Sequence, residues 1–240
     1  MMEFLLVSAA ALLAGFIQGL AGFGSVIVAL PAFTMLTGIK TAAPLSNILA
    51  VGISLYLCIR LRSLHHWRSI GPLIFAALPG ILFGTWILRF IPARYLEISL
   101  AATLTIFCLH SLLGKEFQRA FGTPLACLAG FTSGLLGGSI GACGPPIVLY
   151  YSLQPLEVEE SKSAMSGFFF PVGVGIGISH ALGGLIDTRV LALTALSIPS
   201  VALGTLLGSA CEGKINAQVY RKIMLILLLL FALLLFVKPA

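Results

Sequence analysis

The chain has 240 residues, of which 59% are hydrophobic and 9% are charged, and its formal net charge is +6. Soluble domains carry about 25% charged residues, so this composition excludes an ordinary soluble domain and indicates a membrane domain. The basic residues are scattered singly between apolar stretches, which is typical of topology signals and lipid head-group contacts and argues against a nucleic-acid surface.

Eight hydrophobic stretches follow one another along the chain, and short loops between them carry most of the charge. A membrane-spanning helix needs about 20 apolar residues, and several of the stretches approach that length. We therefore expect an all-α, polytopic integral membrane protein that forms one membrane domain. The stretches are residues 4–37, 43–60, 70–90, 95–113, 121–153, 162–183, 189–210 and 219–237.

The first and fifth stretches share a glycine-rich pattern. Residues 15–31 and 130–146 align at a constant offset of 115, since 130 − 15 = 115 and 146 − 31 = 115. The identical positions are Gly15, Phe16, Gly19, Leu20, Gly22 and Pro31, and Pro79, Gly84 and Thr85 match Pro199, Gly204 and Thr205 at an offset of 120. These matches predict two homologous transmembrane repeats of four stretches each, residues 1–118 and 119–240.

The shared glycines lie in stretches that are too long for one crossing. Residues 4–37 as one helix would span roughly 51 Å, against a hydrocarbon core of ~30 Å. We therefore expect a break at each glycine motif, giving a re-entrant hairpin or two short spans, with Pro31, Pro145 and Pro146 as structural helix breaks. Backbone broken at that depth must be buried in protein or line a wet cavity.

The distribution of basic residues favours ten crossings over eight. Eight crossings place 7 basic residues on each side of the membrane, whereas ten crossings place 5 on one side and 9 on the other. Such a bias is what the positive-inside rule requires. Five crossings per half would also invert the two repeats relative to each other and leave both termini outside.

The breaks are the candidate substrate site. Helices that begin near Ser25 and near Ile140 would direct free N–H groups and positive dipole ends toward the membrane interior, where they can bind an anion. No carboxylate lies deep in a stretch, because Glu97 and Asp187 are near ends, which favours an anion over a cation. The candidate binding residues are Gln18, Gly19, Gly22, Gly24, Ser25, Asn47, Ser133, Gly137, Gly138, Ser139, Gly141, Cys143 and Gly144.

Each of these residue types has a structural alternative. The glycines could serve close helix packing, since the spacing of Gly15 and Gly19 is that of a G-x-x-x-G contact. Asn47 could form an interhelical hydrogen bond, and Cys143 could be a packing residue. His180, which ends its stretch, could carry a proton, but we expect it near the membrane surface. No catalytic, metal-binding or phosphate-binding motif is present, so we expect no enzyme activity and no cofactor.

At these motifs the chain resembles the TauE/SafE family of sulfite and organosulfur-anion permeases. The resemblance covers essentially the whole length and rests on Gly15 to Pro31, Gly130 to Pro146 and the segment from Gly144 to Tyr150. It implies a secondary carrier of the plasma membrane, the inner membrane in bacteria, for a small anion such as sulfite or an organosulfonate. The anion would bind where the two broken segments meet, and rocking of the halves would expose it to each side in turn.

Two other functions stay open at this stage. One is a passive anion channel, and the other is a membrane-embedded sulfur-handling protein that uses Cys143. The sequence also leaves open the identity of the anion, the direction of transport, coupling to protons or sodium, and the oligomeric state.

Overall fold

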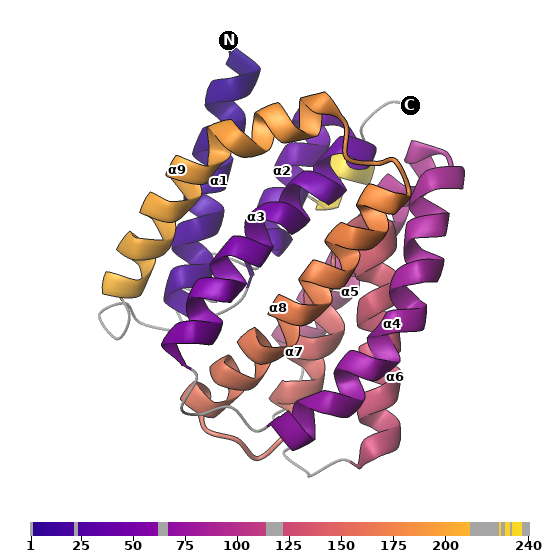
Figure 1. The fold of residues 1–240 in the computed structure, drawn as a ribbon, viewed down its shortest axis with the longest axis vertical. Helices are drawn as coiled ribbons and strands as arrows, with labels where there is room; N and C mark the ends of the chain where they lie inside the picture. Colours follow the sequence, from indigo (N-terminus) through magenta and orange to yellow (C-terminus); the bar gives the residue numbers. More distant parts are fainter. Residues whose placement is uncertain are drawn as a thin grey trace.

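A computed structural model of the chain describes residues 2–21, 24–61, 67–113, 122–211, 226, 229–230 and 232–236. Within these residues the protein is a bundle of α-helices without β-strands (Figure 1). The helices are α1 (Met2–Ala21), α2 (Ser25–Thr37), α3 (Ile39–Arg60), α4 (Trp67–Phe90), α5 (Ala93–Leu113), α6 (Thr123–Ile140), α7 (Gly144–Ser152), α8 (Val158–Leu182) and α9 (Thr188–Ala210).

The bundle has the surface of a membrane protein. Large apolar side chains face outward, among them Phe75 at 74% and Leu82 at 67% exposure, whereas soluble monomers rarely expose large contiguous apolar patches. In the described part of the chain, the helices long and apolar enough to cross a membrane are Ile39–Arg60, Ser69–Phe90, Thr123–Ile140, Glu159–Leu182 and Thr188–Ala210, and shorter apolar helices cover Phe4–Leu20 and Val28–Thr37. The protein is a polytopic helical membrane protein.

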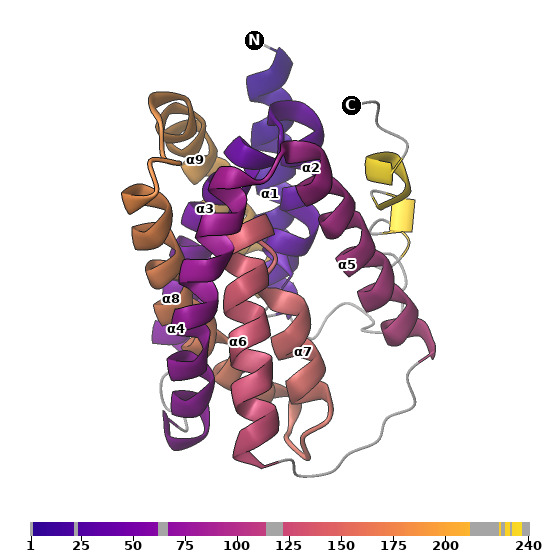
Figure 2. The same cartoon turned by 90° about the vertical axis from the view of Figure 1, so that its right-hand side faces the viewer.

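Both overlong stretches break at glycines. α2 starts after Gly24, whose φ is 102°, and α6 ends before Gly141, whose φ is 77°. Glycine enters this left-handed region readily because it has no Cβ to clash with the following carbonyl. In Figure 2, α7 starts near the middle of the bundle beside α6, so the second break lies well inside the molecule.

Two details of the predicted breaks were wrong. Pro31 does not break a helix, because it lies inside α2. The second short helix starts at Gly144 rather than near Ile140, which is the last residue of α6. Pro145 and Pro146 follow Gly144 in the first turn of α7, where a missing N–H removes no helical hydrogen bond.

Two pairs of helices pack with their backbones in contact. The residue numbers increase together on both helices of each pair, so α4 is parallel to α6 and α1 is parallel to α9. Glycines of α6 and α1 make these contacts, and a Cβ added at any of them would collide with the backbone of the facing helix. Such small-residue packing is typical of membrane helices. The close contacts are Gly130 with Leu73, Gly134 with Ala77, Gly15 with Val201, and Gly19 with Thr205.

The remaining contacts fix the directions of the other helices. The start of α8 meets the ends of α1 and α3, because Lys162 Nζ lies 3.4 Å from the Leu20 carbonyl and Ser163 Oγ lies 3.3 Å from the Leu61 carbonyl. Hence α1, α3 and α9 run one way, and α4, α6 and α8 run the other (Figure 1). Helices related by the sequence offset, α1 with α6, α3 with α8 and α4 with α9, are opposed. This arrangement supports the predicted inverted repeat.

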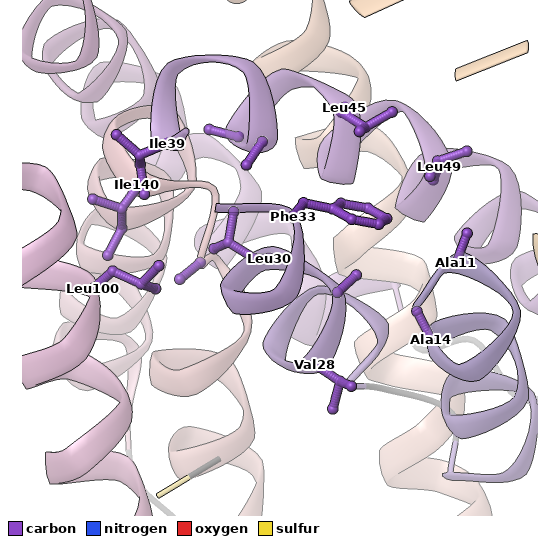
Figure 3. Close-up of a cluster of buried hydrophobic side chains, with 14 of the residues drawn as sticks. Ala11, Ala14, Val28, Leu30, Phe33, Ile39, Leu45, Leu49, Leu100 and Ile140 are labelled. Carbon is purple, nitrogen blue, oxygen red and sulfur yellow. The ribbon is translucent and has the colours of Figure 1, made fainter. Parts of the chain in front are cut away.

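Buried apolar side chains form two clusters. The first comes mainly from α1, α2, α3, α5 and α9, and the second comes from α4, α6, α7 and α8. Figure 3 shows Leu30 and Phe33 of α2 in the first cluster, between Leu45 of α3 and Leu100 of α5. Both α2 side chains are fully buried, so packing holds this short helix, and therefore its N-terminus, in place.

Candidate functional site

The two breaks border one small cavity. It has a volume of about 30 Å³, and because a buried water needs about 10–15 Å³, it is large enough for water or a small ion. One wall comes from the first cluster of helices and the other from the second. The lining residues are Gln18, Gly24, Ser25, Val26, Asn47, Ala50, Val51 and Ser54 on the first wall, and Gly141, Cys143, Gly144, Phe169 and Gly173 on the second.

Two helix N-termini meet at this cavity. In α2, the N–H of Val28 donates to the Gly24 carbonyl at 3.3 Å and makes the first hydrogen bond of the helix. The backbone amides of residues 25–27 therefore have no acceptor within the helix. In α7, Gly144 has a free backbone N–H, but the two prolines after it have none. Each N-terminus also carries roughly half a positive charge from the helix dipole.

Polar side chains complete the first wall. The Ser25 hydroxyl donates to the Gln18 side-chain carbonyl, and the Gln18 amide donates to Ser54 Oγ at 3.3 Å. Asn47 Nδ2 donates to the Gly173 carbonyl of α8 at 3.0 Å. The amide of Asn47 therefore bridges the two walls, so it is both an interhelical hydrogen-bonding group and a lining residue.

The polar side chains that line the cavity are buried, and none of its described lining residues is charged. Gln18, Ser25, Asn47 and Ser54 are each at most 6% exposed. Among the lining residues that the structure describes, none is charged. Amide and hydroxyl groups beside two positive helix ends favour a small anion, since this combination needs no cationic side chain.

Comparison with known proteins agrees with this geometry. A family model described as sulfite exporter TauE/SafE matches residues 7–235. The chain belongs to the TauE/SafE family. Membership in the TauE/SafE family makes the protein a multi-pass plasma-membrane exporter of anions rather than an enzyme.

A curated relative carries a more specific description. It is a probable sulfite/organosulfonate exporter TauE from Cupriavidus necator, 24% identical over 193 residues, which cover 78% of this chain and 75% of the relative. No solved structure matches this TauE/SafE chain.

The cavity brings together about half of the residues that the sequence predicted as a site. These residues come from both predicted repeats and from three separate stretches of sequence. Their gathering follows from the two breaks and from the packing of α3 against α8. The predicted residues that line the cavity are Gln18, Gly24, Ser25, Asn47, Gly141, Cys143 and Gly144.

Other predicted residues have packing or supporting positions. Gly19 faces the backbone of α9, and Gly138 faces the backbone of α4. Ser133 Oγ donates to the Cys143 carbonyl at 2.6 Å, and Ser139 Oγ donates to a carbonyl of its own helix, α6, at 2.6 Å. These four residues are corrected from lining to supporting roles in the TauE/SafE structure.

The last two predicted residues stand apart. Gly137 lies behind the second break, where a Cβ would come 2.6 Å from Ile176 Cδ1 and 2.9 Å from Cys143 Cβ. It supports the wall rather than lining it. Gly22 lies outside the described residues.

Several lining residues were missed. Ser54 follows Asn47 by seven residues, so both lie on one face of α3, and that spacing was a usable signal. Gly173 belongs to a run of alternating glycines in α8, which also indicates close backbone contact. Val26, Ala50, Val51 and Phe169 are apolar residues in apolar helices, and nothing in the sequence distinguishes them.

Proposed function

We propose that the protein is a secondary transporter that moves sulfite or a small organosulfonate across the plasma membrane by alternating access. The observation that carries this proposal is the meeting of two helix N-termini at one buried cavity without charged lining side chains. The curated relative's description as a sulfite/organosulfonate exporter supports the choice of anion.

The anion is bound mainly by the first break. Its oxygens accept hydrogen bonds from the amides at the start of α2 and from the Gly144 amide of α7. The Ser25 hydroxyl, now bonded to Gln18, rotates to donate to the anion. Hydrogen bonds to a charged group contribute about 1.5–3 kcal/mol each, so a few of them together with the helix ends suffice for micromolar to millimolar affinity.

The burial of the polar lining residues favours a carrier over a channel. These residues of the cavity are almost fully buried, as expected for an occluded state between openings to the two sides. The cavity also lies between the two apolar clusters. A movement of the helices of one wall against those of the other would open it.

The test is counterflow in proteoliposomes, in which internal unlabelled anion drives uptake of labelled anion. The panel contains sulfite, ethanesulfonate, sulfate and acetate. We expect saturable counterflow for sulfite or ethanesulfonate, and weaker flux for acetate. Protein-free liposomes measure leakage, and the variant Ser152→Ala, at an exposed position of α7, is the matched control for serine substitutions in the cavity.

Two results would overturn the proposal. Unitary currents in a planar bilayer, with no counterflow for any anion, would indicate a channel. Preference for acetate over both sulfur anions would keep the carrier but reject the substrate class.

A further inference from the structure

His180 in α8 occupies an unexpected position. The sequence predicted that it lies near the membrane surface, at the end of its stretch, and the structure buries the imidazole completely within the protein. Its Nε2 lies 2.9 Å from the carbonyl oxygen of Gly138 in α6. The last carbonyls of a helix have no partner within that helix, so His180 caps the end of α6 directly before the second break.

The partner of Nε2 fixes the hydrogen on the ring. A carbonyl oxygen can only accept a hydrogen bond, so Nε2 carries the hydrogen. In the neutral ring Nδ1 is then an acceptor with a free lone pair. His180 Nδ1 is buried and has no hydrogen-bond partner among the described residues. Buried polar atoms without a partner are rare in folded proteins, and this one is a base with room on its lone pair for a proton.

Few charges surround this base. α6 offers only the thiol of Cys127, about three turns away, and α4 offers the Thr85 hydroxyl, which accepts from Ser179 at 2.8 Å. Among the described residues, Glu97 is a second buried ionisable group near this end of the bundle, because α5 begins where α4 ends. The charged side chains on the neighbouring helix ends, Lys40, Arg89, Asp187 and Arg189, are exposed, and those of α8 itself, Glu159, Glu160 and Lys162, lie at its opposite end.

Two helices connect His180 to the cavity. On α6, Gly141 lines the cavity three residues after Gly138. On α8, Gly173 lines it seven residues before His180, which places both on one face of the helix. Asn47 bonds to the Gly173 carbonyl, so a change at His180 reaches both walls through backbone that already borders the anion.

We propose that Nδ1 of His180 is the proton-binding site that couples proton movement to anion transport, which rests on the proposed transport function. A proton from one side adds to the Nδ1 lone pair and gives an imidazolium. The Gly138 carbonyl at the negative end of α6 stabilises this cation, and its charge attracts the anion into the cavity. After the cavity opens to the other side, the anion leaves and Nδ1 releases the proton there, so both cross in the same direction. The coupled step runs outward, as in an exporter, when the outward anion gradient exceeds the inward proton gradient.

The experiment compares two fluxes in the same proteoliposomes. Counterflow exchanges anion for anion and needs no net proton movement. Net uptake is driven by a pH about one unit lower outside than inside, with the membrane potential clamped at zero. This tenfold proton ratio permits the anion to accumulate up to about tenfold if one proton moves with each anion. Sulfite and ethanesulfonate are the probes, and protein-free liposomes measure the passive redistribution of sulfite.

His180→Gln separates a proton site from a structural role. The glutamine side chain keeps an N–H donor for the Gly138 carbonyl but cannot take up a proton near neutral pH. We expect this variant to retain counterflow and to lose pH-driven accumulation. His110→Gln, at an exposed histidine of α5, should keep both fluxes, and Glu97→Gln tests the competing buried group.

The outcomes are distinct. Counterflow without pH-driven accumulation in the wild type rejects proton coupling while the proposed function stands, and absence of counterflow for every anion rejects the proposed function. Accumulation that persists in His180→Gln, or that disappears in Glu97→Gln with His180 intact, overturns the assignment to His180. Loss of both fluxes in His180→Gln, with helix content unchanged, also overturns it, because the residue then acts in binding or folding.

Discussion

The two breaks are alike in backbone and different in chemistry. The first leads into α2, which has 13 residues and begins with Ser25 and several free amides. The second leads into α7, which has 9 residues and begins with Gly144 followed by two prolines. Both present a positive helix end, but only the first presents many hydrogen-bond donors. In the proposed transport mechanism, the first break binds the anion by hydrogen bonds while the second mainly supplies a wall and an electric field.

The comparison depends most on the second break forming a rigid wall, and Gly137→Leu tests this. The new side chain would press on Cys143 Cβ, which lies 2.9 Å from the position of the first added carbon. We expect counterflow to fall at least about tenfold, because overpacking a buried site costs about 1–3 kcal/mol. Gly71→Leu is the control, since nothing lies within 4 Å of an added Cβ there. Wild-type flux in Gly137→Leu would mean that the second break does not border the substrate.

A second pair of substitutions distinguishes the donors of the first break from the thiol of the second. Ser25→Ala removes a hydroxyl that can donate to the anion, and we expect KM to rise about tenfold or more. Cys143→Ser keeps the size of the side chain, and we expect less than about a threefold change. Counterflow kinetics give both values. If Cys143→Ser abolished activity and Ser25→Ala did not, the roles of the breaks would be reversed and a sulfur-handling function would be favoured.

Pro145→Ala gives the smallest expected effect and makes the two breaks more alike. Alanine adds an N–H to the first turn of α7, which is one more donor beside the cavity. A net hydrogen bond is worth about 0.5–1.5 kcal/mol, so we expect KM to fall about twofold to tenfold. Pro155→Ala, in the exposed loop after α7, should leave KM unchanged. An unchanged or higher KM in Pro145→Ala would show that this turn does not face the anion.

The parts of the fold that local sequence encodes were predictable. Hydrophobic stretch 43–60 became α3 (Ile39–Arg60), and stretch 162–183 became α8 (Val158–Leu182), because apolar length alone decides where a membrane helix runs. Gly24 and Gly141 were also predictable, since a left-handed residue within an overlong stretch selects glycine. The anion-exporter family followed from the same motifs.

Residues whose role depends on a distant partner were not predictable. Pro31 looked like a break, but α2 continues through it, and the preceding helix α1 ends ten residues earlier, at Ala21. Gly19 and Gly138 looked like lining residues. Gly19 instead faces α9 and Gly138 faces α4, and no local sequence pattern reveals these distant partners. His180 is buried only because the end of α6 lies against it.

The two backbone-to-backbone helix pairs have a mechanical consequence. α4 is encoded in the first half of the chain but packs against α6 and α8, while α9 is encoded in the second half but packs against α1. The fourth helix of each half thus packs with helices of the other half. The two packed bodies, α1 with α9 and α4 with α6 and α8, each combine helices from both halves of the sequence. In the proposed transport movement, the connection from α8 to α9 would act as a tether between the two bodies. In this connection Gly184 has a φ of 70°, and no atom lies within 4 Å of an added Cβ. We expect the stiffness of this connection to affect the rate of the transport cycle rather than the affinity for the anion.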